Sequence, residues 1–240
     1  AMRRDFVANV SHEIRTPLTV LSGFVETLQS LALSPQEQHR YLGLMSTQAH
    51  RMQSLVEDLL TLSRLEGSPS PGYKASLPLS QLMSVCQQEA LALSALLDGI
   101  DTPQNVKFST DRSLSHAVIL GEARELQSAL SNLVSNAVRY TPAGGRIEVT
   151  AEVIPNGHLQ LKIKDTGPGI AAEHLPRLTE RFYRVDRSRS RESGGTGLGL
   201  AIVKHVMQRH DGQLSIQSVL GQGSCFTLTL PAARWREHAN

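Results

Sequence analysis

The chain has 240 residues, of which 40% are hydrophobic and 19% charged, so it can bury an ordinary core and a disordered chain is excluded. The net charge is +2 and only 4% of the residues are aromatic, which excludes the basic excess and stacking platforms of a nucleic-acid binder. Two cysteines, Cys86 and Cys225, are too few for a disulfide framework or a cysteine-rich zinc site, and no run approaches the roughly 18 apolar residues of a spanning helix.

Two long helices are predicted at the start of the chain, over residues 5–31 and 34–66. Apolar residues recur in both at spacings of 3 and 4, the period of an amphipathic helix. These residues are Val7, Val10, Ile14, Leu18, Leu21, Val25 and Leu28 in the first helix, and Leu42, Met45, Ala49, Met52, Val56, Leu59 and Leu62 in the second. Ser34 is a good N-cap, because Pro35 follows and Glu37 completes a capping box. A hairpin of two such helices buries too little apolar surface alone, so we expect a homodimer in which two hairpins form a four-helix bundle.

The composition changes after residue 66. Residues 67–72 have the sequence GSPSPG, which is typical of a linker. In the remainder, 73–240, we expect helices over 80–97, 122–139 and 198–210, and strands over 105–110, 116–120, 146–153, 158–165, 213–219 and 224–230. The predicted fold class is α+β, with the hairpin of residues 1–66 followed by an α/β sandwich that contains one mixed sheet.

His12 lies on the polar face of the first predicted helix, roughly 160° around the axis from the apolar stripe. The neighbouring Glu13 is within reach of the imidazole as an orienting or proton-accepting carboxylate. A histidine placed in this way can react with a group that arrives from outside, but an ordinary solvated histidine has the same surroundings. Pro17 removes one helical hydrogen bond and is expected to bend the helix.

Two asparagines, Asn132 and Asn136, lie one turn apart on the helix predicted over 122–139, on the same side as Arg139. Their amide oxygens could hold Mg²⁺ and, with the cation, phosphate groups. The same pattern is also that of an exposed polar helix face.

Asp165 follows a predicted strand and precedes Gly167 and Gly169. A carboxylate in this place could accept a hydrogen bond from the exocyclic amine of adenine, while the glycines allow the backbone to approach the base. The pattern D-x-G-x-G is equally that of a tight turn.

A glycine-rich stretch, GGTGLGL, opens the helix predicted over 198–210 and begins at Gly194. Its spacing is neither that of a dinucleotide-binding fingerprint nor that of a P-loop, but glycines at a helix N-terminus can form a nest for polyphosphate. Six arginines precede it and are expected to belong to a mobile lid over a nucleotide, in preference to a nucleic-acid patch. They are Arg177, Arg181, Arg184, Arg187, Arg189 and Arg191.

In this order the motifs resemble those of bacterial sensor histidine kinases. The string SHEIRTPL at residues 11–18 resembles the phosphoacceptor motif of that family and lies on the hairpin where the family places it. The motifs at 132–140, 165–169, 181–183 and 195–199 resemble the N, G1, F and G2 boxes of the family's catalytic domains. The resemblance spans residues 3–230, and within the family it is greatest to the sensor kinases of the phosphate regulon.

The resemblance implies roles for individual residues. His12 is expected to be the phosphoacceptor, Glu13 the base, and Thr16 the residue that positions water when the partner is dephosphorylated. Asn136 is expected to coordinate Mg²⁺, and Asp165 to read adenine. The whole expected nucleotide site comprises Asn132, Asn136, Arg139, Tyr140, Asp165, Gly167, Gly169, Arg184, Gly195, Thr196, Gly197, Leu198 and Gly199. Arg139 stands where the family more often has lysine, which keeps the charge and changes the geometry.

The function implied by the resemblance is autophosphorylation on His12 with ATP and Mg²⁺, followed by transfer to an aspartate of a response-regulator receiver domain, in phosphate-starvation signalling. Phosphatase activity on the regulator is also expected. The expected partners are the receiver domain and a second copy of the chain, with no nucleic acid. We expect a cytoplasmic fragment of a bacterial inner-membrane protein, which reaches the membrane only through segments upstream of His12.

Two other functions remain open from the residues alone. One is an ATPase of the gyrase and Hsp90 type, which would release ADP without forming a phosphoprotein and gives no reason for the motif around His12. The other is a dimeric scaffold that binds a receiver domain and has a degenerate nucleotide site.

Overall fold

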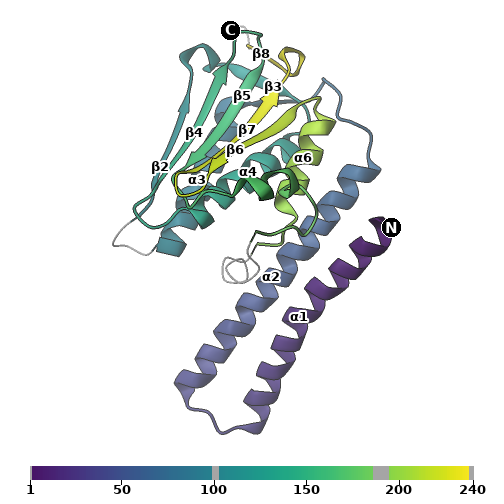
Figure 1. The fold of residues 1–240 in the computed structure, drawn as a ribbon, viewed down its shortest axis with the longest axis vertical. Coiled ribbons are helices and arrows are strands. Elements are labelled where there is room, and N and C mark those ends of the chain that lie inside the picture. The colour runs from purple at the N-terminus through teal and green to yellow at the C-terminus, as the bar shows by residue number, and fades with distance from the viewer. Residues whose placement is uncertain (1, 99–102, 186–194, 238–240) are drawn as a thin grey trace.

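The structure is a computed structural model that describes residues 2–98, 103–185 and 195–237, and it consists of a long helical hairpin joined to an α/β sandwich (Figure 1). Helix α1 spans Met2–Ser30 and helix α2 spans Pro35–Gly67, so both predicted helices are confirmed. The predicted capping box is also present. The Ser34 side chain accepts a hydrogen bond from the Glu37 backbone at 3.3 Å, and the Glu37 carboxylate accepts one from the Ser34 backbone at 2.8 Å. Helix α1 continues through Pro17 without a break.

A five-stranded mixed sheet forms the centre of the sandwich, with strand order β2-β4-β5-β7-β6. Strands β2 and β4 are parallel, and every other neighbouring pair is antiparallel. The strands are β2 (Asn105–Thr110), β4 (Arg146–Val153), β5 (Leu159–Asp165), β6 (Gln213–Val219) and β7 (Gly223–Leu230).

The prediction of a single sheet was wrong. A second, antiparallel sheet pairs β3 (Ala117–Leu120) with β1 (Ser76–Pro78) on one side and β8 (Trp235–Glu237) on the other. Strands β1 and β8 have three residues each, too few to show an alternating pattern in the sequence. All four residues of β3 are buried, so its pattern predicted a strand without indicating which sheet it joins.

Three helices cover one face of the five-stranded sheet: α3 (Leu79–Asp98), α4 (Ala123–Tyr140) and α6 (Gly199–Arg209) (Figure 1). Short 3-10 turns lie at Arg112–Leu114, Ala172–Arg177 and Ala232–Arg234. The core between the layers contains Ile147 and Ile163 from the sheet, with Leu130 and Ile202 from the helices, all fully buried. Full burial of one such side chain contributes about 1.5–3 kcal/mol, so this layer holds the loops at the ends of α4, β5 and α6 in fixed places.

The end of α2 packs against the sandwich, whereas much of the hairpin is exposed. Leu55, Leu62 and Leu65 are buried at that end of α2. Along the predicted apolar stripes, by contrast, Val7 is 62% exposed and Leu42 is 55% exposed in this single chain. Within the ranges described above, no helix has the length and apolar character needed to cross a bilayer.

Candidate active site

The predicted phosphoacceptor region lies where the hairpin faces the sandwich. The side chain of His12 is exposed on α1. Next to it, Glu13 forms ion pairs with Arg51 of α2 at 3.6 Å and with Arg184 of the sandwich at 3.9 Å. The Thr16 hydroxyl donates a hydrogen bond to the His12 carbonyl oxygen at 3.2 Å. The carboxylate predicted to assist His12 is therefore held by guanidinium groups from both parts of the molecule.

The two predicted metal and phosphate residues of α4 are half-buried. The Asn132 amide donates to the Ser128 carbonyl at 2.9 Å, and its oxygen faces the start of α6. A Cβ atom added at Gly199 would lie 2.5 Å from that oxygen, so the glycine allows α4 and α6 to approach each other here. Asn136 lies one turn further along α4, and an amide oxygen is a ligand type that Mg²⁺ accepts together with phosphate oxygens and water. The residues present therefore fit a magnesium–nucleotide site.

Arg139 and Tyr140 lie at the C-terminal end of α4, and both side chains are exposed. They follow Asn136 by one turn and so lie at the rim of the same region of α4. Their predicted contact with a nucleotide stays a prediction.

Asp165 ends strand β5 and is only 6% exposed. Burial raises the pKa of its carboxyl group, and hydrogen bonds from the backbone of Gly167 (2.8 Å) and of Ser224 oppose that rise. The Asp165 carboxylate thus accepts a hydrogen bond within the turn that follows it, and its predicted contact with adenine stays a prediction.

The same turn is packed against the turn between β6 and β7. Gly169 has a φ of +69°, and an added Cβ atom would lie 2.0 Å from the Val219 carbonyl oxygen. The Gly221 backbone donates to the Pro168 carbonyl at 2.6 Å. The turn that follows Asp165 therefore makes a close backbone contact that only glycine permits.

The glycine loop of residues 195–199 contacts the hairpin. The Thr196 hydroxyl donates a hydrogen bond to the Asp58 carboxylate of α2 and accepts one from the Leu198 backbone at 3.2 Å. Burial raises the pKa of Asp58, and the bond from Thr196 opposes this shift. The Arg184 guanidinium donates to the Gly195 carbonyl oxygen, so Arg184 contacts both this loop and Glu13.

Gly197 contacts the segment predicted as the F box. Its φ is +75°, and its carbonyl oxygen accepts a hydrogen bond from the Phe182 backbone at 2.9 Å. Phe182 itself has a φ of +64°, an uncommon conformation for a non-glycine residue, which no sequence pattern indicated. The two residues with positive φ angles thus lie next to each other, where the F-box segment meets the glycine loop.

The other described arginines of the predicted lid contact carboxylates and aromatic rings. Arg177 pairs with Glu180 at 3.1 Å and lies 4.3 Å from the centre of the Tyr183 ring. Arg181 pairs with Glu66 of α2 and lies over the ring of Phe6 of α1. The remaining residues of this prediction, Arg187, Arg189, Arg191 and Gly194, lie outside the described residues. The lid and its contact with phosphates therefore stay predictions.

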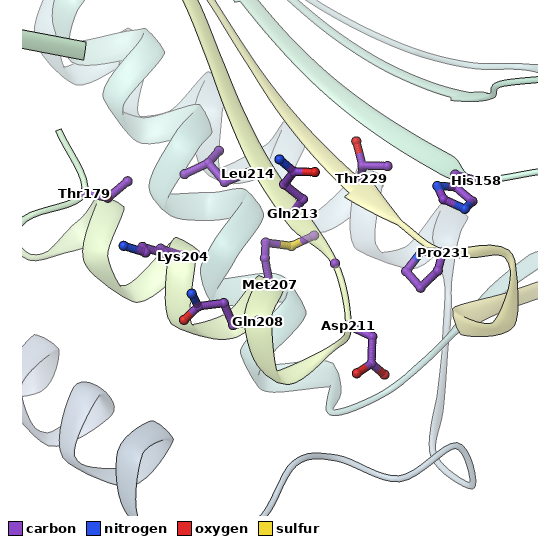
Figure 2. A pocket seen from close by; sticks show the side chains of 11 residues that line it. His158, Thr179, Lys204, Met207, Gln208, Asp211, Gln213, Leu214, Thr229 and Pro231 are labelled. Carbon is purple, nitrogen blue, oxygen red and sulfur yellow. The ribbon is translucent and has the colours of Figure 1, made fainter. Parts of the chain in front are cut away.

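Two cavities lie near these elements. One, of about 480 Å³, is at the C-terminal end of α6, with Lys204, Gln208 and Asp211 on its wall (Figure 2), and contains none of the predicted nucleotide residues. The other, of about 220 Å³, lies between α3 and α4 and includes Asn132 and Cys86. Burial raises the pKa of the Cys86 thiol to about 11, so this cysteine stays a thiol near neutral pH.

In the part of the chain that the structure describes, no group of three or more His, Cys, Asp or Glu side chains could hold a metal ion.

Sequence reasoning missed several residues that join the two parts, above all Asp58. The partners Asp58 and Thr196 are 138 positions apart, and a single aspartate on a helix has no sequence pattern that would distinguish it.

Two protein families match the chain. The His Kinase A (phospho-acceptor) domain matches residues 2–68, and the family of histidine kinase-, DNA gyrase B- and HSP90-like ATPases matches residues 121–234. Together the two matches cover the hairpin and most of the sandwich.

Curated relatives match almost the whole chain. The phosphate regulon sensor protein PhoR of Pseudomonas aeruginosa is 47% identical over 237 residues, which are 98% of this chain and 52% of the relative. The sensor-like histidine kinase SenX3 of Mycolicibacterium smegmatis is 39% identical over 231 residues, which are 96% of this chain and 58% of the relative. The chain thus spans little more than half the length of these relatives.

Solved structures have the same fold. Full-length ShkA in complex with AMPPNP superposes with a TM-score of 0.68 and 28% identity, covering 98% of this chain and 47% of ShkA. The histidine kinase ThkA, solved in complex with the response regulator TrrA, superposes with a TM-score of 0.72 over 95% of this chain and 61% of that one, and at 19% identity it supports the fold alone. With both domain families matched in order and relatives along nearly its whole length, the chain belongs to the sensor histidine kinases.

Proposed function

We propose that this chain transfers the γ-phosphoryl group of ATP to His12 and then to an aspartate on a response-regulator receiver domain. The observation that carries the proposal is the position of Arg184, which contacts Glu13 beside His12 and also the carbonyl of Gly195 in the glycine loop. One side chain thus links Glu13, the neighbour of the predicted acceptor, to the predicted nucleotide loop.

ATP is proposed to bind between α4, the turn after β5 and the glycine loop. Asp165 would accept the adenine amine, and Asn132 would support the phosphates. Asn136 would hold Mg²⁺, which when bound neutralises phosphate charge. ShkA, which this chain resembles along nearly its full length, was solved with an ATP analogue, and this supports the assignment.

The chemical step is an in-line displacement at the γ-phosphorus. A bond forms from one imidazole nitrogen of His12 to phosphorus, and the bond from phosphorus to the bridging oxygen of ADP breaks. The proton on the other imidazole nitrogen passes to the Glu13 carboxylate. Arg51 and Arg184 orient that carboxylate. Positioning of the reacting groups and neutralisation of the phosphate charge are proposed to supply most of the catalysis.

Two partners are proposed, a second copy of the chain and a receiver domain. The exposed apolar residues along α1 and α2, such as Val7 and Leu42, support a homodimer in which two hairpins bury them in a four-helix bundle. The fold shared with ThkA, a kinase crystallised with its response regulator, supports docking of a receiver domain. Thr16 is proposed to position water when the kinase dephosphorylates its regulator.

The biological setting is proposed from the relatives. Identity of 47% with PhoR over 98% of the chain supports a role in phosphate-starvation signalling. We further propose that residues 1–66 are the phosphotransfer hairpin, 67–72 the linker and 73–240 the catalytic domain. The chain is proposed to work in the cytoplasm as part of a longer, membrane-anchored sensor.

Incubation with ATP labelled in the γ-phosphate tests the proposal. The wild-type chain and a His39→Gln control, altered at an exposed histidine of α2, should both take up label. The His12→Gln variant should take up none while it still binds ATP. The label should be lost in acid and kept in alkali, as for phosphohistidine. ADP release without a labelled protein would support an ATPase of the gyrase and Hsp90 type, and failure to bind ATP would support a scaffold.

A further inference from the structure

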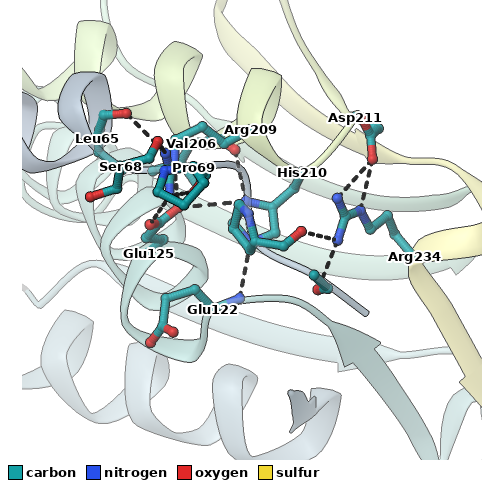
Figure 3. Close-up of polar contacts among 12 residues, drawn as sticks. Leu65, Ser68, Pro69, Glu122, Glu125, Val206, Arg209, His210, Asp211 and Arg234 are labelled. Atoms are coloured by element: carbon teal, nitrogen blue, oxygen red, sulfur yellow. Dashed lines mark hydrogen bonds and ion pairs between the residues drawn. The ribbon is translucent and has the colours of Figure 1, made fainter. Parts of the chain in front are cut away.

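The segment that leaves α2 is held by an arginine at the end of α6. Arg209 forms a bidentate ion pair with Glu125 of α4, with both distances 2.9 Å. Its remaining N–H groups donate to the main-chain carbonyls of Leu65 (3.0 Å), Ser68 (2.7 Å) and Pro69 (3.0 Å) (Figure 3). All five N–H donors of the guanidinium are thus used, three of them on the hairpin and the linker.

A second arginine holds the next part of the linker. Arg234 is 2% exposed and donates to the Asp211 carboxylate at 2.7 and 3.0 Å. It also donates to the carbonyls of Pro71 (3.1 Å) and Gly72 (3.2 Å), and its guanidinium stacks 4.0 Å from the centre of the Tyr73 ring. The Tyr73 hydroxyl completes the cluster with a bond to Asp211 at 3.0 Å.

We call these contacts of Arg209 and Arg234 with residues 65–73 the linker clamp. The clamp binds five main-chain carbonyls, so it fixes the path of the backbone independently of the linker side chains. A Gly/Ser/Pro segment by itself gives a wide range of separations between the parts that it joins. The clamp removes this freedom at the point where the hairpin enters the sandwich.

Helix α6 carries the effect of the clamp to the nucleotide loop. Arg209 is the last residue of α6 and Gly199 is the first, so the loop of residues 195–199 lies about 15 Å away at a rise of 1.5 Å per residue. Contacts with α2 occur along this length, at His205 with Glu66 (3.7 Å) and at Thr196 with Asp58. The clamped end of α6 therefore sets where its loop end lies against the hairpin.

We propose that Arg209 and Arg234 are positioning residues, which hold the sandwich on the hairpin so that the nucleotide loop stays within reach of the helix that carries His12. This inference rests on the proposed function. Loss of the clamp would leave the ATP site intact but spread the sandwich over many orientations, which lowers the effective concentration of the γ-phosphoryl group at His12.

Two variants of the full chain test the clamp. The charged group that loses its partner in Arg234→Ala is Asp211, which is 55% exposed, so this variant leaves no buried charge unpaired. The double variant Arg209→Gln, Glu125→Gln removes both charges of the other ion pair together. The matched control is Lys162→Ala, which breaks an ion pair with Glu152 on the sheet, far along the chain from the linker residues.

Three quantities are measured for each protein: the initial rate of His12 phosphorylation at saturating ATP, the Kd for ATP, and the rate of chymotrypsin cleavage after Tyr73. We expect both clamp variants to lose at least about tenfold in phosphorylation rate, with the Kd for ATP within about twofold of wild type and faster cleavage. The control should match wild type in all three.

Three results would overturn the proposal. The first is phosphorylation at the wild-type rate in both clamp variants although cleavage is faster. The second is cleavage at the wild-type rate, since the linker would then not be held by these arginines. The third is a loss of ATP affinity in step with the rate, which would assign the arginines to folding of the ATP site. If the wild-type chain takes up no label, the proposed function fails and the positioning role falls with it, while cleavage still reports on the clamp.

Discussion

Replacing Gly169 by alanine tests whether the turn after Asp165 is held by close backbone contact. The residue has a φ of +69°, and the left-handed conformation costs an L-residue about 1–2 kcal/mol. The added Cβ would also lie 2.0 Å from the Val219 carbonyl oxygen, which belongs to backbone and cannot rotate away. Overpacking of this kind costs a further 1–3 kcal/mol or so. The sum is a loss of about 2–5 kcal/mol in the free energy of unfolding.

Gly221→Ala is the matched control, because Gly221 has a φ of +79° and no atom within 4 Å of its added Cβ. It should lose only the conformational part, about 1–2 kcal/mol. Urea unfolding followed by fluorescence measures both losses, since Trp235 is the single tryptophan and its indole N–H donates to Gly157 within the sandwich. ATP affinity should fall at least about tenfold in Gly169→Ala, because the turn that carries Asp165 is displaced. Equal losses of stability in the two variants would refute the argument from close contact.

Two further predictions concern buried titratable groups. Asp165→Asn keeps an oxygen that can accept the Gly167 N–H, but it loses the carboxylate proposed to bind adenine. Calorimetric titration should therefore give an ATP affinity about 10-fold to 100-fold lower than that of the wild-type chain. An unchanged affinity would contradict the assignment. Burial lowers the pKa of His210, which is fully buried and accepts a hydrogen bond from the Glu122 backbone at 3.1 Å (Figure 3). Its stabilising contribution is therefore complete above the unfolded value of about 6.5 and is lost as the pH falls through that value toward the lowered pKa. Urea midpoints should decrease from pH 7.5 to pH 5, and His210→Gln should reduce this slope; an equal slope in the variant would count against the histidine.

Much of the fold could be predicted because its signals are local. The apolar spacing of α1 and α2 and the capping box at Ser34 each depend on residues within a few positions of one another. The second sheet could not be predicted in this way. Its strands β1 and β8 pair with β3 from opposite ends of the sandwich sequence, and three residues do not establish a period.

In the candidate site, too, some features could be predicted from the sequence and others could not. Gly169 and Gly197 have positive φ angles and lie close to backbone atoms of Val219 and Phe182, whereas their predicted contacts with a nucleotide stay predictions. The contacts that join the two parts could not be inferred, because Thr196 and Asp58 are 138 positions apart and Arg209 and Leu65 are 144 apart. The composition of residues 67–72 predicted a linker, but it contains no sign that two distant arginines bind its carbonyls.

The central claim is that His12 is the residue that receives the phosphoryl group, and locating the phosphorus on the protein tests it most directly. After incubation with ATP and Mg²⁺, phosphorus NMR of the chain should show a phosphoramidate signal, and peptide mapping should place the added group on His12. Both should be absent from His12→Gln. A phosphoester on the neighbouring Ser11 or on Thr16, or a phosphoramidate signal that persists in His12→Gln, would contradict the account.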